Sequence, residues 1–253
     1  MALKALIFDV DGTLANTERD AHRVAFNLAF EQFGFDWHWS DKLYHELLNV
    51  TGGQQRIKHY LKQYQAEFSV ENLDNLVAQI HALKTKNYLQ LMSQGNIPLR
   101  PGVKRLILEA KASGIVLAIA TTTTPDNVKA LIVNTLGEQA LDWFSVIGAG
   151  NVVEKLKPAA DIYHYVLNKL NLDPSECIAF EDSYNGIVSS TDAKILTLIT
   201  VNEYTKAQSF EDAMVVLNNL GEPDQPFEII QGKPTTHTFV NMAYLQELYE
   251  IHS

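Results

Sequence analysis

The sequence predicts an α/β protein whose doubly wound parallel sheet is interrupted, after its first strand, by an all-helical insertion. The chain opens with an apolar run of strand length that begins at Ala5. The segment from Thr17 to Leu91 then shows only helical patterning, and from Gly102 onward apolar runs alternate with helical segments. Strands that alternate with helices form parallel sheets with helices on their faces. These observations together define the predicted fold class.

The expected strands are short runs rich in Val, Ile, Leu and Phe, which is typical of strands buried on both faces. The first starts at Ala5 and ends in Asp9 and Asp11, and the others are Ile115–Ala120, Phe144–Ile147, Glu176–Phe180 and Ile195–Val201. Helices are expected at 103–113, 125–136, 158–170 and 185–192. These elements make a Rossmann-like core. The chain from Phe210 is less regular, with a turn-rich segment at 221–226 and a terminal helix at 244–251.

The insertion is predicted to be a helical cap domain. Alanines and leucines recur on one face of its first helix, which runs to a stop signal at Gly34. Further helices are expected at 41–48, 54–64 and 71–92, before a Gly- and Pro-marked exit. Trp37 and Trp39 are most simply part of the core of the cap. We expect the cap to span residues 16–95 and the α/β core to consist of residues 1–15 and 96–253.

The composition narrows the class of protein. The 253 residues include 20 basic and 30 acidic side chains, a formal net charge of −10, which disfavours binding to nucleic acid or to an anionic membrane. The single cysteine, Cys177, excludes an internal disulfide and favours a reducing compartment. No apolar run has the length of a membrane span, and Met1 leads directly into the first strand, without room for a signal peptide. We expect a cytoplasmic protein, and a monomer by default.

Polar side chains follow the predicted strands at their carboxyl ends, where open α/β sheets bind ligands. Carboxylates from two strands suit Mg²⁺, which prefers hard oxygen ligands, while hydroxyls and a lysine suit a phosphoryl group. The pattern predicts Mg²⁺-assisted phosphoryl transfer. The residues are Asp9 and Asp11, Thr121 and Thr122, Lys157, and Glu181 and Asp182.

The same residues resemble the motifs of the haloacid dehalogenase (HAD) superfamily. Asp-Val-Asp-Gly-Thr at 9–13 is similar to its first motif, Thr121 to the second, Lys-Pro-Ala-Ala-Asp-Ile-Tyr from Lys157 to the third, and Glu181-Asp182-Ser183 to the fourth. Ala160 replaces the second proline of the third motif. The resemblance covers the chain from Leu3 to about Val201, and the second Asp of the first motif favours the phosphoryl-transfer branch over the dehalogenases.

The resemblance implies a role for each motif residue. Asp9 would attack phosphorus to give an aspartyl-phosphate, and Asp11 would act as general acid and then as general base. Thr121 and Lys157 complete the catalytic set. Asp9, Asp182 and the Asp11 carbonyl would hold Mg²⁺, with Glu181 helping directly or through water.

The insertion resembles the cap of the β-phosphoglucomutase-like group and, within it, CbbY-like proteins, which include xylulose-1,5-bisphosphate phosphatases. The most distinctive stretch is Thr-Gly-Gly-x-x-Arg-Ile at 51–57, in which Gln54 stands where a lysine is usual. The resemblance implies a sugar-phosphate substrate, with a pentulose 1,5-bisphosphate as the best single choice. Its contacts would come from Glu18, His22, Tyr44, Gly53, Arg56, Lys84 and Thr122.

Other interpretations remain open at this point. A phosphosugar mutase would use the same Asp9 and Asp11 but would transfer the phosphoryl group to a sugar phosphate in place of water. A non-catalytic binding module is disfavoured by the complete motif set. In the cap, His22 is equally compatible with packing in the first helix, Lys84 with a solvated helix face, and Arg56 with an exposed ion pair.

Overall fold

The computed structural model describes residues 2–150 and 152–252 and divides into two compact units. One unit, here called the α/β unit, comprises Met1–Asn16 and Pro98–Ser253. The other, the helical unit, comprises Thr17–Ile97. None of the helices formed by residues 2–150 and 152–252 is long and apolar enough to cross a membrane.

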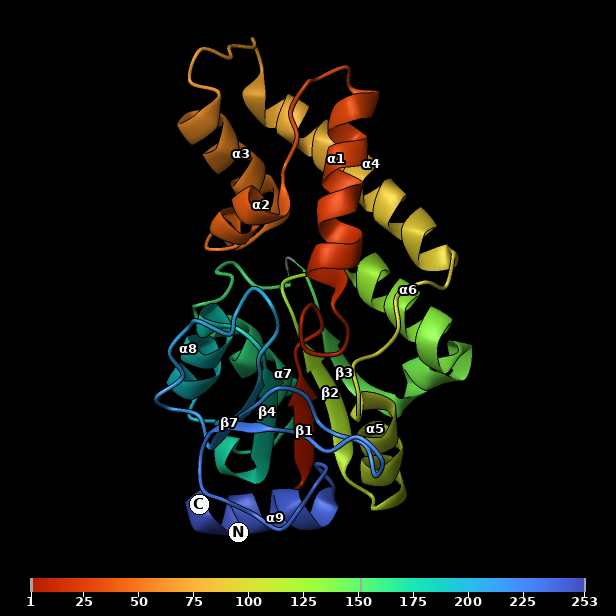
Figure 1. Cartoon of the computed structure of the whole chain (residues 1–253), viewed down its shortest axis with the longest axis vertical. Coiled ribbons are helices and arrows are strands. Elements are labelled where there is room, and N and C mark those ends of the chain that lie inside the picture. The colour runs from red at the N-terminus through yellow and green to blue at the C-terminus, as the bar shows by residue number, and fades with distance from the viewer. Residues whose placement is uncertain (1, 151, 253) are drawn as a thin grey trace. The chain divides into compact units, whose positions relative to one another are not determined.

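The α/β unit is built on a seven-stranded sheet with the strand order β3-β2-β1-β4-β5-β6-β7 (Figure 1). Neighbouring strands are parallel throughout, except for β6 and β7, which are antiparallel. This confirms the predicted fold class and adds an antiparallel edge. The strands are β1 Ala5–Phe8, β2 Val116–Ala120, β3 Phe144–Gly148, β4 Cys177–Glu181, β5 Leu196–Thr200, β6 Val215–Leu217 and β7 Ile229–Gln231.

Helices cover the sheet on both faces (Figure 1). They are α5 Val103–Ala112, α6 Pro125–Leu136, α7 Asp161–Leu170 and α8 Tyr184–Asp192, with short 3₁₀ turns at Glu138–Trp143 (η2) and Pro174–Glu176 (η3). The predicted start of α7 at Pro158 was wrong. The chain first makes a turn, closed by the Ala159 N–H donating to the Leu156 carbonyl at 3.1 Å, and the helix begins only at Asp161.

The two faces of the sheet carry side chains of different size, because successive residues of a strand point to opposite faces. One face carries small residues apart from Ile7 of β1, and it packs in one core cluster with Ile162, Tyr163 and Val166 of α7. The small residues are Ala5, Ala118, Ala120, Cys177 and Ala179. The other face carries larger side chains, and the rings of Phe8 and Phe180 stack there at 4.5 Å. The small residues let α7 approach the sheet closely.

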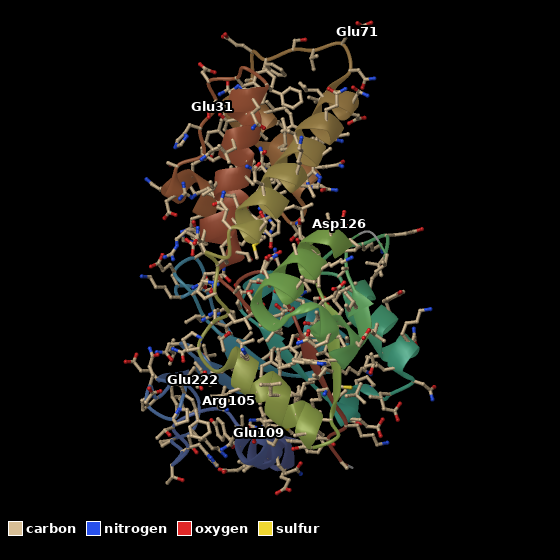
Figure 2. All side chains as sticks on the ribbon, turned by 90° about the vertical axis from the view of Figure 1, so that its right-hand side faces the viewer. Glu31, Glu71, Arg105, Glu109, Asp126 and Glu222 are labelled. Atoms are coloured by element: carbon tan, nitrogen blue, oxygen red, sulfur yellow. The ribbon has the colours of Figure 1, made fainter. Side chains whose placement is uncertain are left out.

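The tail after Phe210 is more regular than the sequence predicted. The expectation that the strand–helix alternation closes with the strand at 195–201 was wrong, because β6 and β7 extend the sheet and α9, Met242–His252, follows. Three-residue strands are too short to give a pattern in the sequence. Arg105 of α5 fastens the tail: it pairs with Glu222 at 2.9 Å and donates to the Val240 and Gly221 carbonyls at 2.8 and 2.7 Å (Figure 2).

The helical unit consists of α1 Arg23–Gln32, α2 Asp41–Leu47, α3 Gly53–Tyr64 and α4 Leu73–Ser93, and a π-helical turn (η1, Glu18–His22) precedes α1. Trp37 and Trp39 are buried among aromatic rings, as predicted for the core of this unit. The Asn27 side chain of α1 fixes the segment that precedes α2, since it accepts from the Trp39 N–H at 2.8 Å and donates to the Trp39 carbonyl at 3.0 Å.

Candidate active site

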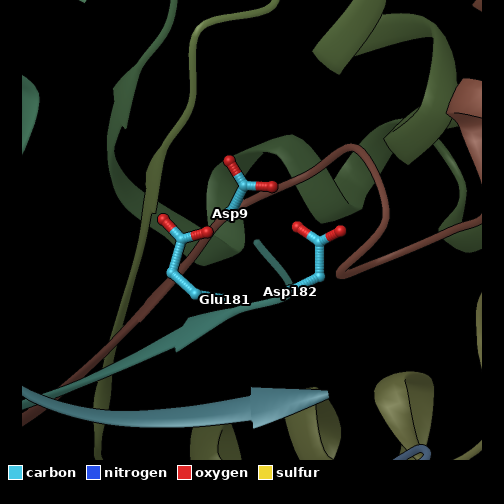
Figure 3. A group of neighbouring side chains, drawn as sticks. All are labelled: Asp9, Glu181 and Asp182. Atoms are coloured by element: carbon cyan, nitrogen blue, oxygen red, sulfur yellow. The ribbon is translucent and has the colours of Figure 1, made fainter. Parts of the chain in front are cut away.

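Carboxylates gather where β1 and β4 end. Asp9 follows β1, Glu181 is the last residue of β4, and Asp182 comes next. Because β1 and β4 pair with Phe8 opposite Phe180, Asp9 and Glu181 take neighbouring positions at the carboxyl edge. One oxygen of each of the three carboxylates lies within 4.8 Å of the others (Figure 3). The strand order reverses between β1 and β4, which is where open α/β sheets bind ligands.

Lys157 joins two of these carboxylates. Its Nζ lies 2.6 Å from Asp9 Oδ1 and 2.6 Å from Glu181 Oε1, and it also donates to the Ala120 carbonyl at the end of β2, at 2.9 Å. The Tyr163 hydroxyl of α7 donates to the same Glu181 oxygen at 2.5 Å. The Lys157 side chain is 6 % exposed, so these bonds form away from bulk water.

The electrostatics of the cluster follow from burial. Burial raises the pKa of Asp9 well above its ordinary value, and the neighbouring Glu181 and Asp182 add to the rise, against the effect of Lys157. Burial also raises the pKa of Asp182 to about 7, although its Oδ2 accepts from the Asn202 side-chain amide at 2.7 Å. Burial lowers the pKa of Lys157, but Asp9 and Glu181 outweigh it and leave the pKa above its ordinary value.

This cluster fits a metal cation. Three buried carboxylates face one ammonium group in direct contact, and the Arg100 guanidinium acts on Asp182 without bonding it, so carboxylates outnumber cations in a water-poor site. Among the described residues, Glu181 Oε2 is buried and has no hydrogen-bond partner. Carboxylate oxygens are the ligands that hard divalent cations prefer. Asp9, Glu181 and Asp182 are therefore the residues that would hold such an ion.

The hydroxyl-bearing residues lie at the end of β2, beside β1 and β3. Thr121 is buried, and its Oγ1 accepts from the Thr123 N–H at 3.3 Å, while Thr122 is partly exposed. The Asn127 side chain donates to Thr123 Oγ1 at 2.9 Å and stiffens this loop. Asp11 is partly exposed and lies in the turn that follows β1.

The predicted substrate residues of the helical unit form two contact groups. In the first, the Tyr44 hydroxyl donates to Glu18 Oε2 and accepts from Arg56 Nη1 at 2.9 Å. Arg56 Nη1 also lies 3.6 Å from Glu18 Oε2, and the Arg56 residue is 7 % exposed. The alternative of an exposed ion pair is therefore wrong in the exposure, because Arg56 is buried, but Arg56 does lie beside an acidic residue, Glu18.

The second group contains His22 and Lys84. Lys84 Nζ lies 2.5 Å from His22 Nδ1, so the two side chains contact each other directly. The His22 ring stacks on Tyr88 at 4.4 Å, and Lys84 lies over the Phe26 ring at 4.9 Å. Lys84 is buried, which excludes its interpretation as a solvated charge.

Three residues for which the sequence predicted no role belong to these groups. Tyr163 is the last residue of the third motif and lies in α7, and Asn202 follows β5 outside any motif. His81 of α4 lies against Gly53, where a Cβ would come within 2.5 Å of its Nε2. Burial, with Lys84, His22 and Arg56 nearby, lowers the pKa of His81 to about 4. For His81 the signal in the sequence was the glycine at position 53, since His81 occupies the space that a side chain there would fill.

Comparison with known proteins places this architecture in a family. The model of the haloacid dehalogenase-like hydrolases matches residues 3–193. The plasmid-encoded CbbY protein of Cupriavidus necator is 44% identical over 246 residues, 96% of either chain. CbbY of Rhodobacter capsulatus is 46% identical over 213 residues, 84% of this chain and 92% of the relative.

Among solved structures, a variant of CbbY from Rhodobacter sphaeroides in complex with xylulose-(1,5)bisphosphate superposes with a TM-score of 0.80 at 40% identity. The match covers 86% of this chain and 94% of that one. The chain belongs to the haloacid dehalogenase-like hydrolases. Within them it is a phosphatase-type enzyme of the CbbY-like family.

Proposed function

We propose that this protein is a Mg²⁺-dependent phosphatase that hydrolyses a small sugar bisphosphate, with xylulose 1,5-bisphosphate as the most specific candidate. The observation that carries the proposal is the buried cluster of Asp9, Lys157, Glu181 and Asp182 at the switch point of the sheet. The choice of sugar is supported by the CbbY relatives, one of which binds xylulose-(1,5)bisphosphate.

In the proposed reaction an Asp9 oxygen attacks phosphorus, and the ester P–O bond breaks as Asp11 transfers a proton to the leaving sugar oxygen. Asp11, now a carboxylate, then takes a proton from the water that hydrolyses the aspartyl-phosphate, which frees Asp9 and phosphate. Thr121 and Lys157 hold the phosphoryl oxygens. Mg²⁺, held by Asp9, Asp182, the Asp11 carbonyl and Glu181, would neutralise charge on those oxygens.

We assign recognition of the rest of the substrate mainly to the helical unit. Arg56 offers a buried guanidinium that suits a second phosphate, with Nη1 held in place by Tyr44 and Glu18, and Lys84 adds a second buried cation. Gly53 begins α3, where backbone N–H groups favour anions. Glu18, Tyr44 and His22 would bond sugar hydroxyls, and Thr122 of the α/β unit would add a further polar contact.

The test is release of phosphate from xylulose 1,5-bisphosphate and from the corresponding monophosphates, with and without Mg²⁺. We expect Mg²⁺-dependent release, fastest from the bisphosphate, and no turnover by Asp9→Asn, because an amide cannot attack phosphorus. Turnover by Asp9→Asn close to that of the wild type would overturn the assignment. A second incubation, with β-glucose 1-phosphate and a trace of glucose 1,6-bisphosphate, tests the mutase alternative. Glucose 6-phosphate formed without free phosphate would establish a mutase.

A further inference from the structure

Arg100 is a buried cation that the proposed reaction does not use. It is 7 % exposed and donates to oxygens from separate parts of the α/β unit. Its Nη1 donates to the Gly12 carbonyl and to the Thr200 carbonyl and hydroxyl, the last two at 2.9 and 3.1 Å. Its Nη2 donates to the Val201 and Asn218 carbonyls at 2.6 and 2.7 Å. None of these partners is a carboxylate.

Burying a guanidinium without a carboxylate hydrogen-bond partner costs free energy, and the negative charge of nearby Asp182 offsets only part of that cost, since the pKa of Arg100 is still lowered by burial. What the guanidinium adds is geometric. Its rigid, planar fork fixes several backbone segments relative to one another, which neither an apolar residue nor a lysine can do. The identity of the segments that Arg100 joins therefore indicates its role.

One of these segments is the turn that carries Asp11. The Gly12 N–H donates to the Ala15 carbonyl at 2.8 Å and the Leu14 N–H donates to the Val10 carbonyl at 2.9 Å, so the turn is closed on itself. Arg100 holds it from outside at two points, because its backbone N–H donates to the Leu14 carbonyl at 2.8 Å while its side chain bonds the Gly12 carbonyl.

The other segment is the end of β5. Val201, which accepts from Arg100, precedes Asn202, whose side-chain amide donates to Asp182 at 2.7 Å. One guanidinium therefore joins the peptide that follows Asp11 to the strand end that supports Asp182.

We infer that Arg100 is a positioning residue that holds the Asp11 turn in register with the reacting phosphoryl group, so that Asp11 can protonate the leaving oxygen. The inference rests on the proposed general-acid role of Asp11. Proton transfer requires hydrogen-bond reach, and a displacement of about 1 Å costs up to about a hundredfold in rate. The position of the Asp11 turn, which Arg100 fixes, therefore affects proton transfer to the leaving oxygen more than it affects the attack by Asp9.

This role has a measurable signature in the leaving group. p-Nitrophenolate departs without a proton, whereas the alkoxide of benzyl phosphate must be protonated as it leaves. The two substrates have similar shape, and kcat/KM for each reports the first chemical step and not hydrolysis of the aspartyl-phosphate. A defect in positioning Asp11 therefore lowers kcat/KM for benzyl phosphate more than for p-nitrophenyl phosphate.

The experiment measures both values of kcat/KM at saturating Mg²⁺ for the wild type, Arg100→Lys and Arg100→Met. Arg105→Met is the matched control, because Arg105 also donates to backbone carbonyls but to none in the Asp11 turn. We expect Arg100→Lys to lose at least about tenfold more activity on benzyl phosphate than on p-nitrophenyl phosphate. Arg105→Met should change the two values equally.

Equal losses on the two substrates, or no loss, would overturn the inference. If the Arg100 variants do not fold, Thr200→Val removes a single acceptor of the fork and must show the same bias, to a smaller degree. Asp11→Asn separates the two hypotheses. If it shows no leaving-group bias, the proposed role of Asp11 fails; if it shows the bias and the Arg100 or Thr200 variants do not, only the inference about Arg100 fails.

Discussion

The carboxylate of Glu181 occupies the space that a side chain at position 186 would fill, and Gly186 has none. A Cβ there would overlap Glu181 Oε2. The other oxygen, Oε1, accepts from Lys157 and Tyr163 at 2.6 and 2.5 Å, so the carboxylate cannot turn away without losing both bonds. The glycine in the first turn of α8 therefore allows Glu181, the last residue of β4, to keep its position.

Gly186→Ala should displace Glu181 and weaken the proposed cation site. We expect the Mg²⁺ concentration for half-maximal phosphate release to rise roughly tenfold or more, the usual scale for a disturbed metal environment. The measurement is a Mg²⁺ titration of p-nitrophenyl phosphate hydrolysis. Asp192→Ala, at the exposed end of the same helix, is the control. An unchanged Mg²⁺ requirement in Gly186→Ala would contradict the assignment of Glu181.

Lys157→Met should destabilise the fold because it leaves Asp9 and Glu181 buried without their shared cation. Removing one partner of a buried ion pair typically costs about 3 kcal/mol or more. Thermal unfolding without Mg²⁺ should show a lower midpoint, and added Mg²⁺ should raise the midpoint more than it does in the wild type. Lys155→Met removes an exposed charge two residues away and should have little effect. Equal destabilisation by the two variants would refute the idea.

Arg56→Ala should impair hydrolysis of the bisphosphate far more than that of a monophosphate. A charge-assisted contact to a desolvated phosphate is worth about 2 kcal/mol, which should appear as a lower kcat/KM for the bisphosphate only. Lys58→Ala is the matched control, since it removes a half-exposed positive charge from the same helix. A similar loss on both substrates would remove Arg56 from the recognition of the second phosphate.

His81 should make the stability of the protein depend on pH. Its pKa is about 4 in the folded protein and about 6.5 in an unfolded chain, so between these values the unfolded chain binds the extra proton. The free energy of unfolding should therefore fall as the pH drops from about 6.5 toward 4, by about 2 kcal/mol at pH 4.5. Urea unfolding at pH 7 and 4.5 should show a smaller drop for His81→Asn than for the wild type. His38→Asn changes an exposed histidine and should keep the wild-type drop.

The parts of this molecule that the sequence predicts are those with a strong local signal. Continuous apolar runs placed β1 to β5 to within two residues, and the polar residues after them marked the strand ends that meet at Asp9, Lys157 and Glu181. The strands β6 and β7 escaped prediction because three residues carry too little pattern. The contacts of Tyr163, Asn202 and His81 escaped prediction because their partners are distant in the chain: Tyr163 closes the third motif but bonds Glu181 across a helix–sheet interface that no local periodicity encodes.

The small residues on the α7 face of the sheet have a consequence beyond packing. Tyr163 bonds Glu181 at 2.5 Å and packs in one cluster with Ala118, Ala120 and Ala179, where larger side chains would push α7 away from the strands. The volume of these side chains therefore bears on the length of a bond to a candidate metal ligand. A single added methyl group in this core, far from any substrate, would alter the chemistry of the site by moving the helix that supplies the hydroxyl.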